Sequence, residues 1–183
     1  MIAKIFEIKE TENKGKGLFA KNFIPKGTII DFECKECKTF SPKDLEKLPE
    51  FKRTLILENS YPQLDGSLTV LCDEARYMNH SCNANVLDSG EDFDIVVRDI
   101  KKGEESTYDY RMFYEHPTKK TMRCNCGEKT CCKIVKSVHP TPNVLKRIWS
   151  RKIISALELT KKVNQPLKEE LLKTSNRFKK FLI

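Results

Sequence analysis

The cysteines are the residues whose spacing points most directly to chemistry. Three of them share one short loop in a C-x-C-x4-C pattern around Gly127: Cys124, Cys126 and Cys131. Soft thiolates at this spacing favour tetrahedral Zn(II), and a glycine lets the loop fold back on the ion. Three ligands leave a structural site open, so the fourth comes either from elsewhere, with Cys82 as the candidate, or from the adjacent Cys132. Neighbouring cysteines rarely bind one ion comfortably, and the alternative to a metal site is a set of buried thiols.

Three further stretches carry groups suited to binding or catalysis. The segment "ARYMNHSCNAN" over 75–85 holds an Asn-His pair next to Cys82, "STYDY" places Tyr108 and Tyr110 around an acid, and "NKGKG" gives a Gly15–Gly17 turn. Each signal is weak alone, since "TYDY" is typical of strand packing and a Gly-x-Gly turn is common in hairpins. Their order along the chain, with the cysteine loop last, is the more specific feature.

The elements that must position these groups are short strands divided by Gly and Pro turns. Strands are predicted at 2–8, on both sides of the Pro25–Gly27 turn, at Arg76–Met78 before the Asn-His pair, and on both sides of the Lys101–Gly103 turn. A short helix is predicted from Pro42, with Ser41 as its cap. From Pro142 the apolar period becomes helical, and a second helix is predicted from Pro166. The pattern indicates a mainly β domain followed by a C-terminal α-helical extension.

The charge is concentrated in that extension. Lys and Arg number 34 against 26 Asp and Glu, a net charge of +8, and residues 139–183 contain eleven Lys and Arg against three Glu. The preceding residues are therefore close to neutral. A basic extension suggests contact with nucleic acid or another polyanion, and the alternative is a solvated lysine-rich helix face.

The chain shows no sign of a membrane or secreted protein. No apolar run approaches the ~20 residues that a membrane span requires, and the N-terminus lacks the apolar core of a signal peptide. We therefore expect an intracellular protein without membrane contact. Eight cysteines in a reducing compartment favour thiolates and metal over disulfides.

"NHSC", "TYDY" and the C-x-C-x4-C loop, in this order, resemble the SET-domain family of protein-lysine methyltransferases over about Ile5 to Lys133. The resemblance implies several small β-sheets around a pseudoknot, in which the "NHSC" segment is threaded by the "TYDY" segment. It divides the chain into a SET domain at 1–115 with a variable insert at about 38–72, a post-SET zinc-binding loop at 116–138, and the basic helical extension at 139–183.

The resemblance also assigns roles to individual residues. It implies Tyr110 as the catalytic tyrosine, with Tyr108 influencing how many methyl groups are added. S-adenosylmethionine would be bound by residues from the Gly15–Gly17 turn, from the segment over 75–85 and from "TYDY": Lys16, Gly17, Leu18, Arg76, Tyr77, Asn79, His80 and Tyr110. One zinc ion per chain would be held by the cysteine of "NHSC" and three from the post-SET loop: Cys82, Cys124, Cys126 and Cys131.

The reaction so implied is an SN2 methyl transfer from a sulfonium to the neutral amine of a lysine. A dry aromatic channel and the sulfonium charge both disfavour the ammonium form of that lysine, so no strong base is needed. A hydroxyl at Tyr108 leaves less room for a methylated amine, which favours mono- or dimethylation. A histone tail is the leading substrate, and another lysine-bearing protein is the second.

The resemblance is incomplete in places that affect the shape of the substrate groove but remove no proposed catalytic group, and a rival function of a different class is also considered. Ala84 stands where the family has Pro, Ser106 where it has Leu, and "DFECKEC" where a Tyr-x-Gly-Glu piece is common. The rival is a catalytically weak, zinc-stabilised SET-like module that binds nucleic acid or chromatin. We expect a nuclear, chromatin-bound protein if the source is eukaryotic, and a cytoplasmic or host-directed one if it is bacterial or viral.

We also predict the roles or positions of a few cysteine, aromatic and histidine residues, most of them outside the proposed site. Cys34 and Cys37 are interpreted as thiols without metal, the alternative being a second zinc site with Cys72 or Cys132. Three aromatic residues are expected in the core or the channel lining: Tyr77, Phe113 and Tyr114. Surface positions are expected for His116 and His139.

Overall fold

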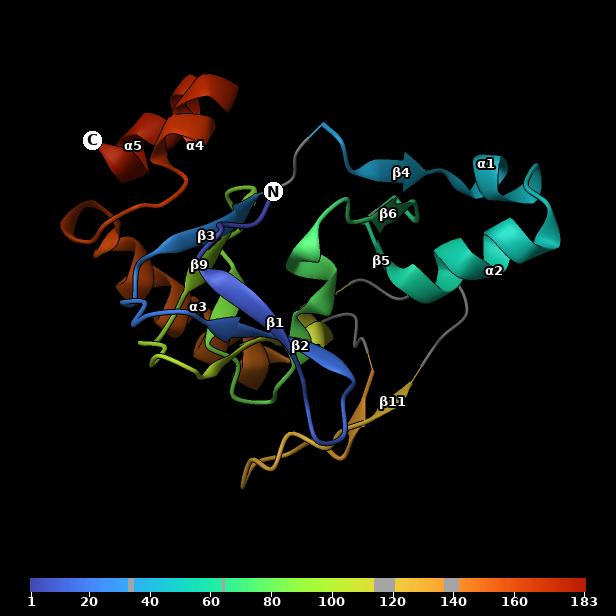
Figure 1. Ribbon diagram of the computed structural model, residues 1–183, viewed down its shortest axis with the longest axis horizontal. Helices are drawn as coiled ribbons and strands as arrows, with labels where there is room; N and C mark the ends of the chain where they lie inside the picture. The colour runs from blue at the N-terminus through green and yellow to red at the C-terminus, as the bar shows by residue number, and fades with distance from the viewer. Residues whose placement is uncertain (33–34, 64, 114–120, 137–141) are drawn as a thin grey trace.

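The computed structural model describes residues 1–32, 35–63, 65–113, 121–136 and 142–183, and its architecture is mainly β with a helical C-terminal part (Figure 1). The strands are β1 Phe6–Glu10, β2 Lys16–Ala20, β3 Ile29–Phe32, β4 Lys38–Phe40, β5 Ser60–Pro62, β6 Leu68–Val70, β7 Asn79–His80, β8 Val86–Asp88, β9 Phe93–Val96, β10 Glu105–Tyr108, β11 Met122–Arg123 and β12 Ile134–Val135. The α-helices are α1 Pro42–Glu46, α2 Glu50–Asn59, α3 Asn143–Leu157, α4 Lys168–Thr174 and α5 Lys179–Leu182. Short 3₁₀-helices span Glu74–Tyr77, Tyr110–Met112, Thr160–Lys162 and Asn176–Phe178.

Strand β10 lies at the centre of the main sheet, whose order is β1-β2-β10-β8-β9-β3 with β7 also paired to β10. It runs antiparallel to β2 and parallel to β7 and β8, so the segment that ends at Tyr110 crosses between two stretches from elsewhere in the chain. The parallel register places Thr107 beside Asn79 and Tyr108 beside His80. This pairing brings the "NHSC" and "TYDY" segments into contact.

A buried asparagine completes the hydrogen bonding of β10. Asn85 is fully buried, its amide nitrogen donates to the carbonyl of Glu105 at 2.8 Å, and its amide oxygen accepts from the N–H of Thr107 at 2.8 Å. Buried backbone groups need such partners. The side chain of Asn85 therefore replaces a strand neighbour on β10 at this point of the crossing.

The C-terminal helices share a hydrophobic core with the sheet. One buried cluster joins apolar side chains of β3, β8 and β9 to six from the extension, which are Ala156 and five large ones: Trp149, Leu167, Leu171, Phe178 and Leu182. Figure 1 shows α3 beside β9, with α4 and α5 above it at the end of the chain. The helices are therefore part of the core, and none of those in the described ranges is long and apolar enough to span a membrane.

Polar contacts fix the extension to the edge strand β3. The amide of Gln165 accepts from the N–H of Ile29 at 2.8 Å and donates to the carbonyl of Gly27 at 2.9 Å. Gly27 has a φ of +93°, and a methyl group at its Cα would lie 2.7 Å from the Cβ of Leu159. The Pro25–Gly27 turn thus needs a glycine both for its backbone conformation and for the close approach of the extension.

The insert forms a separate lobe of the three strands β4, β6 and β5 with helices α1 and α2 (Figure 1). Helix α1 begins at Pro42 with Ser41 as its N-cap, as predicted, and a reciprocal capping box also joins Ser41 to Asp44. Helix α2 contains no buried residue, and Phe51 and Leu55 on it are 64% and 57% exposed. Its apolar residues, which the sequence left unassigned, form a helix that packs only loosely.

Several boundaries differ from the sequence-based expectation. The predicted Arg76–Met78 strand is wrong, because Glu74–Tyr77 is a 3₁₀-helix capped by the side chain of Asp73. The first strand begins at Phe6 rather than at Ile2, which forms an isolated bridge. The helix predicted from Pro166 begins at Lys168, whereas α3 follows Pro142 directly as expected.

We predict that Gly27→Ala lowers the free energy of unfolding by roughly 3 kcal/mol, because it combines backbone strain with overpacking against Leu159. Gly103→Ala is the matched control, since Gly103 also has a positive φ of +76° but has nothing within 4 Å of the point that a Cβ would occupy. It should cost only about 1 kcal/mol of strain. Urea unfolding measures both, and equal losses would contradict the close packing of the extension.

Candidate functional site

Asn79 connects three of the segments that the sequence singled out. Its amide nitrogen donates to the carbonyl of Lys16 and to the carboxylate of Glu105, both at 2.9 Å. A methyl group at Gly17 would meet the Glu105 carboxylate at 2.7 Å and the Asn79 amide at 3.1 Å. Gly17 therefore permits a close packing of β2 on the "NHSC" segment that no larger residue allows.

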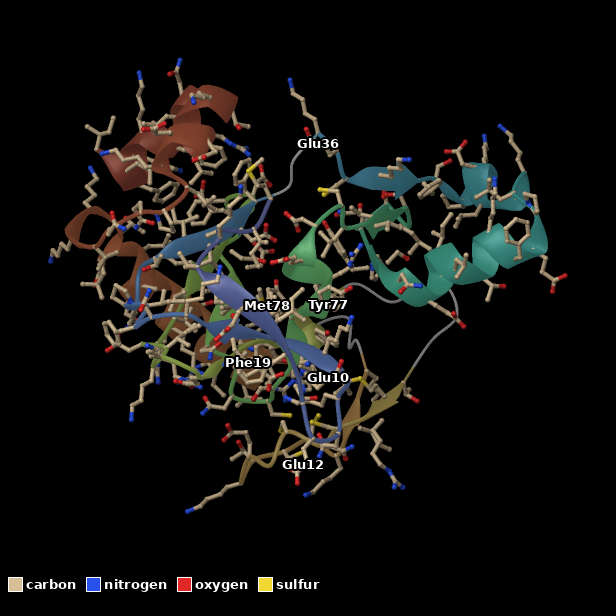
Figure 2. The ribbon with its side chains drawn as sticks, in the orientation of Figure 1. Glu10, Glu12, Phe19, Glu36, Tyr77 and Met78 are labelled. Atoms are coloured by element: carbon tan, nitrogen blue, oxygen red, sulfur yellow. The ribbon has the colours of Figure 1, made fainter. Side chains whose placement is uncertain are left out.

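Charged and aromatic groups border this contact at the surface. The Lys16 ammonium and the Arg76 guanidinium lie 5.7 Å and 5.1 Å from the ring centre of Tyr77. Figure 2 shows Tyr77 and Met78 in the middle of the molecule, between the β1–β2 pair and the insert. Leu18 is fully buried and can offer this surface only its backbone. The structure thus groups Lys16, Gly17, Arg76, Tyr77 and Asn79.

Tyr110 lies two residues beyond the end of β10, and hydrogen bonds hold both its backbone and its phenol. Its backbone N–H donates to Nδ1 of His80 at 3.1 Å, and its phenol donates to the carbonyl of Met78 at 2.7 Å. Burial, and then the charge of Glu105, raise the pKa of Tyr110 to about 12. The phenol therefore keeps its proton at neutral pH, and its oxygen lone pairs remain available to accept a hydrogen bond.

Tyr108 belongs to an aromatic cluster centred on Phe113. The ring of Phe113 stacks on Tyr108 at 5.1 Å and on Tyr61 at 5.7 Å, and lies tilted against Tyr110 at 5.3 Å. The hydroxyl oxygen of Tyr108 accepts from the N–H of Asp88 at 3.1 Å. Burial, followed by the nearby carboxylates of Asp94 and Asp88, raises the pKa of Tyr108 well above its usual value.

The four cysteines predicted to bind metal lie together. The ligand atoms of Cys82, Cys124, Cys126 and Cys131 all lie within 4.8 Å of one another, and the sulfurs of Cys82 and Cys124 are 3.7 Å apart. A tetrahedral ion with metal–sulfur bonds of about 2.3 Å requires sulfurs about 3.8 Å apart. This donor set has the chemistry and the spacing for Zn(II). A second set also lies within 4.8 Å: His80, Cys82, Cys124 and Cys132.

The hydrogen bonds of His80 argue against that second set. Burial lowers the pKa of His80, against the opposing charge of Asp109, so the ring is neutral. Because Nδ1 accepts the Tyr110 N–H, the ring proton is assigned to Nε2, which lies 3.4 Å from the sulfur of Cys82. A protonated Nε2 cannot bind metal, but it can donate to the Cys82 sulfur and orient it.

The thiols differ in how readily they ionise. Burial raises the pKa of Cys82, and it raises that of Cys124 to about 12. At Cys126 burial also opposes ionisation, but hydrogen bonds from backbone groups and the neighbouring thiols outweigh it and lower the pKa to about 7. A metal must therefore displace protons from at least two of these sulfurs, so its affinity falls as the pH is lowered.

Asp109, between the two tyrosines, is a buried charge that the sequence did not single out. It is 2% exposed and pairs with the guanidinium of Arg111 at 2.6 Å. Its Oδ2 also accepts from the indole N–H of Trp149, on α3, at 3.0 Å. The link from the extension could not be read from spacing, because 40 residues separate Asp109 and Trp149.

Two more contacts of the site come from residues that the sequence left without a role. Tyr61 joins the aromatic cluster from the insert, and Glu105 anchors Asn79 while also pairing with the ammonium of Lys14. Ser106, where the family has Leu, is fully buried, and its hydroxyl has no hydrogen-bond partner within the described residues. Single aromatic or acidic residues in such short segments give no periodic signal that would have identified them.

The remaining predictions concern the other cysteines and residues outside the described ranges. The sulfurs of Cys37 and Cys72 lie 3.7 Å apart, across from each other near the base of the insert. The expectations for Cys34, Tyr114, His116 and His139, and for domain boundaries near 115 and 138, fall on residues outside the described ranges.

A sequence profile of the SET domain matches residues 15–111, just over half of the 183 residues. The chain belongs to the SET-domain family. The match begins at the Gly15–Gly17 turn and ends at Arg111, so it contains the crossing and both tyrosines. The family membership predicted from "NHSC" and "TYDY" is therefore confirmed.

Similar SET-domain proteins are known from several eukaryotes. "Histone-lysine N-methyltransferase, H3 lysine-36 specific" of Debaryomyces hansenii is 33% identical over 141 residues, which cover 68% of this chain and 18% of that protein. "Histone-lysine N-methyltransferase ASHR3" of Arabidopsis thaliana is 39% identical over 85 residues, 43% of this chain and 16% of that protein. The chain thus spans under a fifth of the length of either protein.

Comparison with solved structures confirms the fold. The structure titled "KRYPTONITE in complex with mCHG DNA and SAH" matches 70% of this chain and 28% of its own chain, with a TM-score of 0.50 and 18% sequence identity. The predicted fold class, a mainly β SET fold with a helical C-terminal part, is therefore correct.

We predict that Cys131→Ser reduces the zinc content from one ion per chain to well under half, because it removes one of four ligands. Cys132→Ser, on the neighbouring residue, should keep close to one ion and serves as the matched control. Atomic emission on the purified chains measures the ratio. Loss of zinc in Cys132→Ser with retention in Cys131→Ser would instead support the set that contains His80.

Proposed function

We propose that this SET-domain chain is an S-adenosylmethionine-dependent protein-lysine N-methyltransferase. The observation that carries the proposal is the position of Tyr110. Its phenol donates a hydrogen bond to the carbonyl of Met78, the residue directly before the Asn79–His80 pair. The names of the similar histone-lysine methyltransferases support it. An intact Tyr110 and Asn79 favour an enzyme over the rival, a catalytically weak module that binds nucleic acid or chromatin.

The residues around Asn79 suit the proposed cofactor. The carboxylate of S-adenosylmethionine needs cationic partners, which Lys16 and Arg76 would supply beside the face of Tyr77. Backbone groups of Gly17, Leu18 and His80, with the amide of Asn79, would make the remaining polar contacts. When bound, the cofactor supplies an electrophilic methyl group on a sulfonium. The SAH named with KRYPTONITE, a fold relative, is consistent with this assignment.

The aromatic cluster would then hold the substrate lysine in its neutral form. An unperturbed lysine has a pKa of about 10.4, and a dry aromatic surface lowers it because the charged form loses hydration. Phe113, Tyr108 and Tyr61 provide such a surface next to Tyr110. Alignment of the amine with the methyl group supplies the rate enhancement, and water can accept the proton afterwards.

Tyr110 would act as a positioned hydrogen-bond acceptor. Its O–H donates a hydrogen bond to the carbonyl of Met78, and burial raises its pKa to about 12, so the phenol does not serve as a base near neutral pH. Its oxygen lone pairs would orient the amine or the polarised methyl group in the transition state. This assignment explains why the phenol is fixed from two sides.

The proposed substrate is a basic segment of protein, with a histone tail as the first candidate. The histone-lysine methyltransferases to which the chain is similar point the same way, towards chromatin and a nuclear location in a eukaryotic host.

The proposed zinc ion would hold the cysteine loop against the "NHSC" segment through Cys82, Cys124, Cys126 and Cys131. The exposed face of the extension would contact nucleic acid through lysines such as Lys161, Lys162 and Lys168. Its buried face belongs to the core, so replacing exposed lysines tests this contact, whereas truncation would disrupt the fold.

We predict that Tyr110→Phe lowers kcat for methyl transfer to a histone mixture by about 100-fold or more, because it removes a positioned transition-state contact. Tyr61→Phe removes a hydroxyl from the same aromatic cluster and should keep at least about a third of the activity. A radiolabelled transfer assay with mass spectrometry of the products compares them. Undiminished transfer by Tyr110→Phe would refute its proposed role.

We predict that the wild-type chain produces mono- or dimethyllysine and that Tyr108→Phe shifts the products towards higher methylation. Loss of the hydroxyl enlarges the space around the amine. It also leaves the N–H of Asp88 without its acceptor, at about 1 kcal/mol of stability. Mass spectrometry of a peptide product over time measures the distribution. An unchanged distribution at equal turnover would show that Tyr108 does not limit methylation.

A further inference from the structure

We infer that Trp149, in the C-terminal extension, is a positioning residue for the methyl-transfer and metal sites. It would act through Asp109, and the extension would thereby become a working part of the enzyme. The inference rests on the proposed function. It concerns a contact that joins the matched SET region to the extension, since Asp109 lies within residues 15–111 and Trp149 lies beyond them.

The contact is short, buried and made by a charged group. The indole N–H of Trp149 donates to Oδ2 of Asp109 at 3.0 Å, with the two residues 8% and 2% exposed. A buried carboxylate is costly unless donors surround it. Besides Trp149, Arg111 is the donor, through its backbone N–H at 3.1 Å, its Nε at 2.8 Å and its Nη2 at 2.6 Å. Among the described residues, Trp149 is thus the only hydrogen-bond donor to the Asp109 carboxylate from outside this turn, and His80 places its unprotonated Nδ1 3.9 Å from Oδ1.

Arg111 carries the contact on to the metal site. The Nη2 of Arg111 that bonds Asp109 also donates to the carbonyl of Cys82 at 3.3 Å. The chain of hydrogen bonds therefore runs from Trp149 through Asp109 and Arg111 to a residue whose sulfur belongs to the candidate metal site. Outer contacts of this kind orient metal ligands, and their loss commonly costs roughly 10- to 100-fold in affinity or activity.

Asp109 also fixes the course of the chain between the two tyrosines. It lies between Tyr108 and Tyr110, and its side chain caps the 3₁₀-helix that Tyr110 begins. Trp149 thus acts on the carboxylate that fixes how the chain turns from β10 into the 3₁₀-helix containing Tyr110.

The extension is anchored firmly enough to transmit this constraint. A second contact beside Trp149 joins the ammonium of Lys152 to the side-chain oxygen of Asn83 at 3.0 Å. Between α3 and the cysteine loop lies a cavity of about 180 Å³ that is lined by Trp149, Asp109, Arg111 and Cys82. Since this cavity leaves little packing on one side of the network, the hydrogen bonds have to hold the groups in place.

The test uses the full zinc-loaded chain with Trp149→Phe, which keeps an apolar ring but removes the N–H donor. We expect zinc to pass to a colorimetric chelator about tenfold faster than from wild type. We also expect kcat for methyl transfer to fall about tenfold, with KM for S-adenosylmethionine changed less than threefold. Ile154→Ala, at a position 58% exposed on the same helix, should match wild type in all three. Zinc release and kcat within twofold of wild type in Trp149→Phe would overturn the inference.

A double-mutant cycle separates positioning from packing. Asp109→Asn keeps the indole and the shape of the site, and should also release zinc about tenfold faster. If Trp149 acts through Asp109, the double variant Trp149→Phe/Asp109→Asn is no worse than the poorer single variant. If the double variant instead releases zinc faster by the product of the two single-variant effects, Trp149 acts by packing alone, and the inference is overturned.

Two further outcomes are distinguished by the same samples. If the Trp149→Phe variant fails to fold, the Asp109→Asn variant carries the test. Because Trp149 is the only tryptophan in the sequence, its fluorescence reports whether Asp109→Asn is folded. In that case, zinc release from Asp109→Asn at the wild-type rate would overturn the inference. A wild-type chain that holds zinc but transfers no methyl group would refute the proposed function, while the zinc-release comparison would still decide the role of Trp149.

Discussion

The parallel pairing of β7 with β10 is the constraint on which the site depends. Two residues from the "NHSC" segment are matched with two from the "TYDY" segment, and the N–H of Ser81 donates to the carbonyl of Tyr108 at 3.0 Å. Once this register is fixed, Asn79 faces β2, His80 faces Tyr110, and the sulfur of Cys82 lies near the cysteine loop. A shift by one residue would turn each of these side chains to the opposite face of the strand.

The extension contributes to the same constraint from outside the matched domain. Burial of a large apolar side chain contributes about 2 kcal/mol, so five of them from the extension account for roughly 10 kcal/mol. That is comparable with the whole stability of a typical domain, about 5–15 kcal/mol. The extension, which contains the excess positive charge of the chain, thus has two faces. Its apolar face is part of the core, and most of its lysines lie on the exposed face.

The sequence predicted those parts of the site that depend on local motifs. The turns at Pro25–Gly27 and Lys101–Gly103, the capped helix at Pro42 and the three-cysteine loop could be inferred from residue types and spacing, whereas the full set of four cysteines was implied by the resemblance to the SET-domain family. The 3₁₀-helix at Glu74–Tyr77 and helix α2 could not. The first depends on a side-chain cap by Asp73, and the second contains apolar residues that remain exposed. Contacts across long separations, such as Trp149 with Asp109, depend on how the extension docks and have no local signature.

Calorimetric titration of S-adenosylmethionine into the zinc-loaded chain tests the central claim most directly, because the proposed cofactor site exists only if β7 and β10 are paired as described. The account predicts one cofactor bound per wild-type chain and at least roughly tenfold weaker binding by Asn79→Ala, which loses the contacts to Lys16 and Glu105. A wild-type chain that binds no cofactor, or an Asn79→Ala variant that binds as tightly as wild type, would contradict it.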